Sequence, residues 1–192
     1  MPILMLIEVP NTSTETYDRA NEIASVNDEV PEGLISHVAA VEGDTLVVAD
    51  VWESEAALNR FFEERLGAAL AETGMDAQPR IFPVHNHIAQ GAGTDANVLV
   101  LWEADGFTPE AYDDVTSKMA AHGGDGSSHP GVSHVAGVTD EGMVFVDVWG
   151  SEEEIQRFLE EEIQPAAGGA TPPGRPRFAR VHNVLTGSKQ PA

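Results

Sequence analysis

The stretch of sequence that decides the fold occurs twice. Residues 36–54 read SHVAAVEGDTLVVADVWES, and residues 133–151 read SHVAGVTDEGMVFVDVWGS. Each copy has two apolar runs separated by a short polar break with a glycine, which is typical of two strands joined by a tight turn. A serine follows the second run, so we expect a helix to begin there. The repetition of this hairpin indicates that the chain contains two similar units.

The similarity extends through most of the chain. Val-His-Asn occurs at residues 84–86 and again at 181–183, and Tyr17 has a counterpart in Tyr112. Each unit reads β-α-β-β-α-β, which is the order of a ferredoxin-like fold. The fold class is therefore predicted to be α+β, with two tandem ferredoxin-like units. Because each sheet has helices on one face only, the two units can cover each other by closing into a pseudo-twofold α/β barrel.

The repeat also predicts the domain boundaries. We expect a first unit over residues 1–91, a linker at 92–96, a second unit over 97–187 and a tail at 188–192.

Composition excludes several classes of function. The 192 residues include no cysteine, so disulfides, thiolate chemistry and cysteine zinc sites are excluded. Ten Lys and Arg stand against 32 Asp and Glu, a net charge of −22 that would repel nucleic acid and anionic membranes. The first ten residues, MPILMLIEVP, lack the basic start of a signal peptide, and no run is long enough to span a membrane. We expect a cytoplasmic protein.

Two histidine–aspartate pairs are the candidate catalytic groups. If Gly43 and Asp44 form the turn of the first hairpin, His37 lies directly opposite Asp50 on the neighbouring strand. The same count in the second copy places His134 opposite Asp147. A carboxylate fixes the tautomer of a histidine and raises its basicity, so either pair could act as a general base. The alternative is that each pair is only a satisfied polar contact within the sheet.

The second strand of each hairpin has two faces, and the residue types suggest which face lines the barrel. The small apolar set at residues 47, 49 and 51 is predicted to pack under helices. The mixed set, which contains Asp50 and Trp52 in one copy and Asp147 and Trp149 in the other, is predicted to face the barrel interior. Trp52 and Trp149 are therefore candidate ligand-binding residues, with core packing as the alternative.

The last strand of each unit carries further histidines. His85 and His87 share a face and could share a metal, but the second copy has His182 followed by Val184 in place of the second histidine. No third ligand is evident from the spacing, so we expect no metal site. His85 and His182 are candidate ligand-binding residues, and hydrogen bonding to neighbouring strands is the alternative.

A strand ending in DVWES or DVWGS, followed directly by a helix with a phenylalanine pair, resembles the dimeric α/β-barrel superfamily. The chain is most similar to its antibiotic biosynthesis monooxygenase-like (ABM) proteins, here as a tandem duplication. That resemblance implies cofactor-independent oxygenases of aromatic polyketides, or haem-degrading enzymes. The haem-degrading members carry a haem-binding histidine on the helix after the tryptophan, whereas residues 54–72 and 151–169 contain none. We therefore expect no haem, and no other cofactor.

These observations predict a small-molecule pocket protein, specifically a cofactor-independent monooxygenase acting on an aromatic or polyketide-like substrate. His37 with Asp50, or His134 with Asp147, would remove a proton from the substrate. Two alternatives remain open: a metabolite-binding barrel without catalysis, and a base-catalysed isomerase or cyclase that uses the same pocket. We expect a small-molecule ligand as the partner, with no nucleic acid or membrane. Because the barrel interface would be internal, the protein is predicted to be a monomer (a pseudo-dimer) or a weak homodimer.

Overall fold

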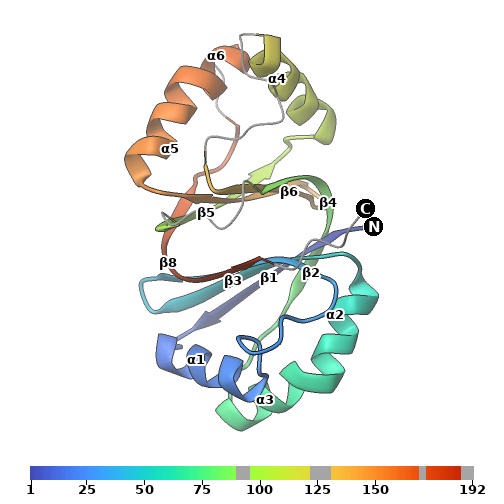
Figure 1. The fold of residues 1–192 in the computed structure, drawn as a ribbon. Helices are drawn as coiled ribbons and strands as arrows, with labels where there is room; N and C mark the ends of the chain where they lie inside the picture. The colour runs from blue at the N-terminus through green and yellow to red at the C-terminus, as the bar shows by residue number, and fades with distance from the viewer. Residues whose placement is uncertain (90–95, 122–130, 169–171, 187–192) are drawn as a thin grey trace. The chain divides into compact units, whose positions relative to one another are not determined.

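The computed structural model of the chain describes residues 1–89, 96–121, 131–168 and 172–186 (Figure 1). The predicted linker at 92–96, apart from residue 96, and the predicted tail at 188–192 lie outside the described residues.

The element order is β-α-β-β-α-β, twice over, which confirms the predicted α+β fold of ferredoxin-like units. The first half contains β1 (Ile3–Pro10), α1 (Thr14–Ile23), β2 (Leu34–Glu42), β3 (Thr45–Trp52), α2 (Glu55–Phe61), the π-helical turn η1 (Phe62–Leu66), α3 (Gly67–Thr73) and β4 (Arg80–Ala89). The second half contains β5 (Val98–Asp105), α4 (Pro109–Ala121), β6 (Ser133–Val138), β7 (Gly142–Trp149), α5 (Glu152–Phe158), the π-helical turn η2 (Leu159–Ile163), α6 (Gln164–Ala166) and β8 (Arg177–Thr186).

The last strand of each repeat joins the sheet of the other repeat. The strands hydrogen-bond in the order β1-β3-β2-β8 in one sheet segment and β5-β7-β6-β4 in the other. Two compact units result: residues 1–83 with the chain from Ala179 form unit 1, and residues 84–178 form unit 2. In unit 1, β8 pairs with β2, and in unit 2 the end of β4 pairs with β6. Each unit therefore takes one strand from the other repeat.

The predicted helix starts are correct. Ser54 Oγ accepts a hydrogen bond from the backbone N–H of Ala57 at 3.2 Å, and Ser151 Oγ accepts one from Glu154 at 3.3 Å. Ser13 caps α1 in the same way. These caps satisfy backbone N–H groups that a helix start otherwise leaves unpaired, so α2 and α5 begin at a fixed distance from the ends of β3 and β7.

The mixed face of β3 packs against helices, so its predicted position in the barrel interior is wrong. Leu46, Val48 and Trp52 belong to one buried cluster with Tyr17 of α1 and Phe61 of α2. In Figure 1, α1, α2 and α3 all lie on one side of strands β1 to β3. The small apolar set at residues 47, 49 and 51 is equally buried, on the opposite face. Because both faces of β3 are buried, the residue types on each face do not show which face the helices cover.

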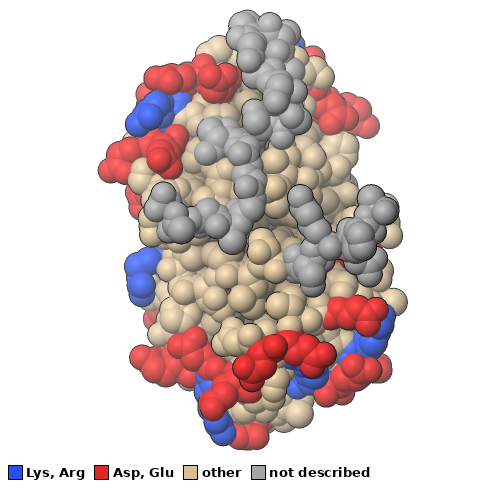
Figure 2. All heavy atoms as spheres, in the orientation of Figure 1, with Lys and Arg blue, Asp and Glu red and all other residues tan. Residues whose placement is uncertain are grey.

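Acidic side chains gather over the outer helices (Figure 2). The first turn of α5 contains Glu152, Glu153 and Glu154, and the first turn of η2 contains Glu160, Glu161 and Glu162. Among the described residues, no helix is both long enough and apolar enough to cross a membrane.

Candidate functional site

A chain of four side chains, three of them buried and Asn183 partly buried, crosses from the sheet to α1 in unit 1. The hairpin register is as predicted, with His37 directly opposite Asp50. His37 Nδ1 lies 2.6 Å from Asp50 Oδ1, and His37 Nε2 lies 2.6 Å from the hydroxyl of Tyr17. Because a carboxylate only accepts, neutral His37 carries its proton on Nδ1 and accepts the Tyr17 proton at Nε2. The amide Nδ2 of Asn183 donates to the Tyr17 oxygen at 3.0 Å.

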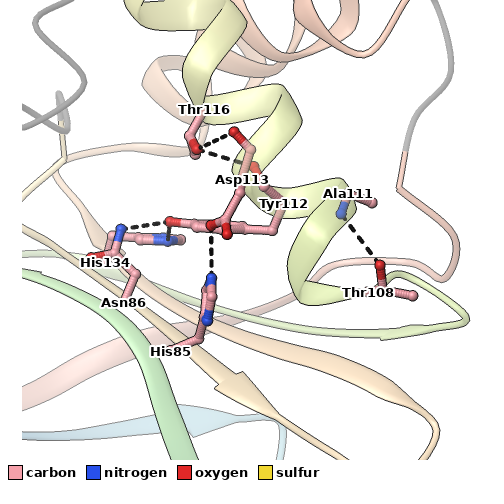
Figure 3. A network of polar contacts seen from close by, with 8 residues as sticks. All are labelled: His85, Asn86, Thr108, Ala111, Tyr112, Asp113, Thr116 and His134. Atoms are coloured by element: carbon pink, nitrogen blue, oxygen red, sulfur yellow. Dashed lines mark hydrogen bonds and ion pairs between the residues drawn. The ribbon is translucent and has the colours of Figure 1, made fainter.

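Unit 2 contains the same chain of hydrogen bonds, and Figure 3 shows the part that joins His134, Tyr112 and Asn86. His134 lies opposite Asp147, with 2.6 Å between Nδ1 and Oδ1. The Tyr112 hydroxyl lies 2.8 Å from His134 Nε2 and accepts a 2.8 Å hydrogen bond from Asn86 Nδ2. The connected atoms are identical to those of unit 1. We call each set of four side chains an Asp–His–Tyr–Asn relay.

A bulge in the exchanged strand aims two adjacent residues at the helix. In unit 1, Val181 pairs with Ala40 while Asn183 pairs with Ala39, so His182 is the extra residue. A regular strand would turn His182 and Asn183 to opposite faces, but a bulge lets both reach the same side. The same shift occurs in β4 between residues 84 and 86. Both relays therefore depend on an irregularity in a strand that comes from the other repeat.

The predicted ligand-binding residues His85 and His182 lie beside the relay tyrosines. His182 Nε2 is 2.8 Å from Asp18 Oδ1, and His85 Nε2 is 2.8 Å from Asp113 Oδ1. Each imidazole meets a tyrosine ring edge to face, at 5.6 Å for Tyr17 and 5.5 Å for the unit 2 pair. The side chains of His182 and His85 are 25% and 26% exposed, so they reach the surface from the buried relay. Their ligand-binding role stays a prediction.

Burial controls the protonation of the relay tyrosines. Tyr17 is 3% exposed and Tyr112 is 8% exposed. Desolvation raises the pKa of each phenol to about 12, although the asparagine hydrogen bonds act in the opposite direction. Both tyrosines therefore keep their protons at neutral pH, and a free tyrosinate does not form there.

The two predicted tryptophans lie on the same face of the sheet as the relay aspartates. Trp52 stacks on Phe61, with 5.4 Å between ring centroids, and Trp149 packs on Phe158 at 5.3 Å. Trp52 is fully buried, and its Nε1 has no hydrogen-bond partner. Both rings belong to the helix–sheet core, and their ligand-binding role stays a prediction.

His87 does not share a ligand site with His85. His85 is the bulged residue that reaches Asp113, whereas His87 pairs with Val135 on β6. Burial and the nearby His134 lower the pKa of His87 below its usual 6.5. Within the part of the chain that the structure describes, no three His, Asp or Glu side chains are arranged to hold a metal ion.

Sequence reasoning missed half of each relay. The sequence pattern did not identify Tyr17, Tyr112, Asn86 or Asn183 as site residues. The signal was present, because the tyrosines and the Val-His-Asn segments both recur in the repeat. Since adjacent His and Asn point to opposite faces of a regular strand, the bulge was needed to connect them.

Comparisons with known proteins support the fold. No protein-family model matches the sequence, and no curated protein matches it. Among solved structures, a proposed monooxygenase from Lactobacillus acidophilus NCFM is similar with a TM-score of 0.69, 14% identity and 96% of each chain covered. An anthrone oxidase-like protein gives a TM-score of 0.54 and 16% identity over 100% of this chain and 95% of the other.

A third similar structure is an uncharacterized ferredoxin-fold protein from Listeria monocytogenes 4b F2365 that is related to antibiotic biosynthesis monooxygenases. It gives a TM-score of 0.52 and 7% identity over 95% of this chain and 96% of the other. Identities this low show a shared fold and not a shared activity. The chain shares the ferredoxin-like fold of these three proteins.

Proposed function

We propose that this chain is a cofactor-independent monooxygenase in which an Asp–His–Tyr–Asn relay accepts a proton from a phenol or enol of an aromatic, polyketide-like substrate. The observation that carries the proposal is the relay itself, which is built twice from the same atoms with distances of 2.6–3.0 Å. Buried ionisable groups rarely add stability compared with apolar residues of similar size, so a chemical role accounts for them better than a structural one.

The tyrosine oxygen is the atom that would meet the substrate. A phenol has one proton and two lone pairs. In unit 1, His37 Nε2 accepts the Tyr17 proton and Asn183 Nδ2 occupies one lone pair, so one lone pair remains. A substrate hydroxyl could donate to that lone pair.

Proton transfer through the tyrosine avoids an unfavourable tyrosinate. As the substrate proton moves to the Tyr17 oxygen, the Tyr17 proton moves to His37 Nε2. The Asp50 carboxylate then stabilises the imidazolium, as in other relays where an aspartate orients a histidine base. Since the pKa of Tyr17 is about 12, a route that never leaves the phenol ionised costs less than one that does.

The substrate anion supplies the electrons for oxygen. With an anthrone-type substrate, as the name of one structural neighbour suggests, the anion adds to O2 at the ring CH2 carbon and forms a C–O bond. The peroxide takes back the proton held by the relay. Loss of water then leaves a carbonyl: one oxygen atom stays in the product, the other leaves as water, and the four electrons lost by the substrate reduce O2.

The test is oxygen uptake with anthrone as the probe, measured on the full chain. Tyr17→Phe and Tyr112→Phe remove the two relay hydroxyls and keep the rings. We expect the double variant to lose about 100-fold or more of the rate, the contribution typical of a general base. Thr16→Val is the matched control, because it removes a neighbouring hydroxyl outside the relay.

Two outcomes would contradict the proposed function. One is a double variant that consumes oxygen as fast as the unsubstituted chain while its thermal unfolding is normal. The other is an unsubstituted chain that catalyses no oxygen uptake with anthrone.

A further inference from the structure

The relays of the two units differ one helical turn beyond the tyrosine. In unit 1 that position is Asn21, and in unit 2 it is Thr116. The Thr116 hydroxyl turns back to its own helix and donates to the carbonyl oxygens of Tyr112 and Asp113, both at 3.1 Å (Figure 3). Asn21 is 7% exposed, and its amide Nδ2 has no hydrogen-bond partner.

The unpaired amide of Asn21 belongs to the side chain one helical turn beyond Tyr17. Asn21 follows Tyr17 by four residues in α1, so the two side chains lie on the same face of the helix, and Asn21 lowers the pKa of Tyr17. Asn21 Nδ2 nevertheless makes no hydrogen bond of good geometry. Burying an unsatisfied N–H costs about 1–3 kcal/mol. Unit 1 bears this cost at Asn21, whereas the matching Thr116 side chain of unit 2 is satisfied.

A second unpaired donor lies toward the same end of the helix–sheet layer. β3 runs antiparallel to β1, and α1 returns along the sheet from the end of β1, so α1 and β3 run in the same direction (Figure 1). Asn21 follows Tyr17 by one turn, and Trp52 follows Asp50 by two residues. Trp52 Nε1 is buried without a partner. Unit 1 therefore holds two buried N–H groups that a ligand oxygen could satisfy.

We propose that unit 1 is the ligand-binding half, and that Asn21 Nδ2 donates to the oxygen of the same phenol or enol hydroxyl that donates its proton to Tyr17. This inference rests on the proposed function for the direction of proton transfer. As the proton leaves, negative charge develops on an oxygen that already faces an amide donor. In unit 2, the only hydrogen of the Thr116 hydroxyl is already directed to its own helix, so the relay there lacks this donor.

The proposal predicts one binding site per chain. It also predicts that exchanging the residue types at positions 21 and 116 changes which unit binds the ligand. The probe is 1,8-dihydroxyanthraquinone, which has the phenol but no CH2 carbon to oxidise. Calorimetric titration of the full chain is expected to give one molecule bound per chain, with a red-shifted phenolate absorbance at neutral pH. Asn21→Thr is expected to weaken binding at least tenfold and to abolish the shift. Thr116→Asn is expected to add a second site, a gain that does not depend on the stability of the first variant.

The outcomes separate this inference from the proposed function. Two equivalent sites, no binding of the probe, or an Asn21→Thr variant with unchanged affinity would each overturn the inference. If the probe binds once and its shift depends on Asn21 while anthrone causes no oxygen uptake, the inference holds and the proposed oxygenase function fails. If oxygen uptake depends equally on Tyr17 and Tyr112 and is unchanged in Asn21→Thr, the proposed function holds and the inference fails.

Discussion

The two units share their hydrogen-bond relay but differ in what surrounds it. Both relays join the same atoms, because strand register and the bulge in the exchanged strand place them. The side chain of Asp50 is 7% exposed, whereas that of Asp147 is 15% exposed. The sheets therefore preserve the geometry of the relay, whereas the helices have diverged and change its environment.

The anchoring of the first helix by η1 is a second difference. Arg65 in η1 donates to the backbone carbonyls of Ala24, Ser25 and Glu29 at 2.7–2.8 Å, which ties the segment after α1 to η1. The matching residue of η2 is Glu162, whose carboxylate cannot donate in this way. The helix that carries Tyr17 and Asn21 is therefore anchored at its end by a cation, whereas the matching position of η2 is an acid.

High pH tests the relay that the two units share. The chain has two tyrosines, and both belong to relays, so tyrosinate absorbance at 295 nm reports only on them. With pKa values of about 12 for both, we expect no tyrosinate signal below about pH 11 while the chain is folded. Because folding raises the pKa above the unfolded value near 10, stability is fully present below pH 10 and is lost as pH rises toward 12. The expected loss is about 3 kcal/mol per tyrosine.

Tyr17→Phe and Tyr112→Phe assign this loss to each unit. Each single variant is expected to halve the absorbance change and to remove about half of the extra pH sensitivity, measured by urea unfolding at pH 9 and pH 11.5. A tyrosine that ionises near pH 10 in the folded chain would show that its relay is open to water.

The difference in burial is tested by removing each aspartate. Asp50→Ala leaves the Nδ1–H of His37 buried without an acceptor, with an expected loss of about 3 kcal/mol in the free energy of unfolding. Asp147→Ala is expected to cost about 2 kcal/mol, because water reaches the more exposed site and can accept from His134. Asp140→Ala, in an exposed turn, is the control and is expected to change stability by less than about 0.5 kcal/mol. Equal losses at Asp50 and Asp147 would contradict the difference between units.

Strand pairing followed from the sequence because the hairpin turn set the register. Glu42 pairs with Thr45, so counting outward placed His37 opposite Asp50 correctly. The same count, continued outward, would place Ile35 opposite Trp52, but a register shift between residues 34 and 36 places Leu34 there instead. Irregularities of this kind depend on twist and packing, and a count of residues does not include them.

The face of the sheet and the partners of the relay could not be predicted. Both faces of β3 are buried, so alternation of residue types gave two sets without showing which one the helices cover. Asn183 reaches Tyr17 across 166 residues of sequence, through a strand exchanged from the other repeat and bulged at His182. In the sequence, the relay tyrosines and asparagines are marked only by their occurrence in both copies of the repeat.

The smallest expected effect tests the anchor of α1. Arg65→Met keeps most of the aliphatic packing but removes three charge-assisted hydrogen bonds to carbonyls that end or follow α1. We expect a loss of about 1–2 kcal/mol in the free energy of unfolding. Hydrogen exchange of α1 should become faster, while that of α4 stays unchanged. Glu162→Met is the matched control in unit 2 and should leave the exchange of both helices as it was.

Because Asn21 lies in the last turn of α1, Arg65→Met should also weaken binding of the anthraquinone probe without removing any group that contacts it. If α1 exchanges at its original rate in Arg65→Met, the end of the helix is held by its packing on the sheet, and the difference between the units lies in Asn21 alone.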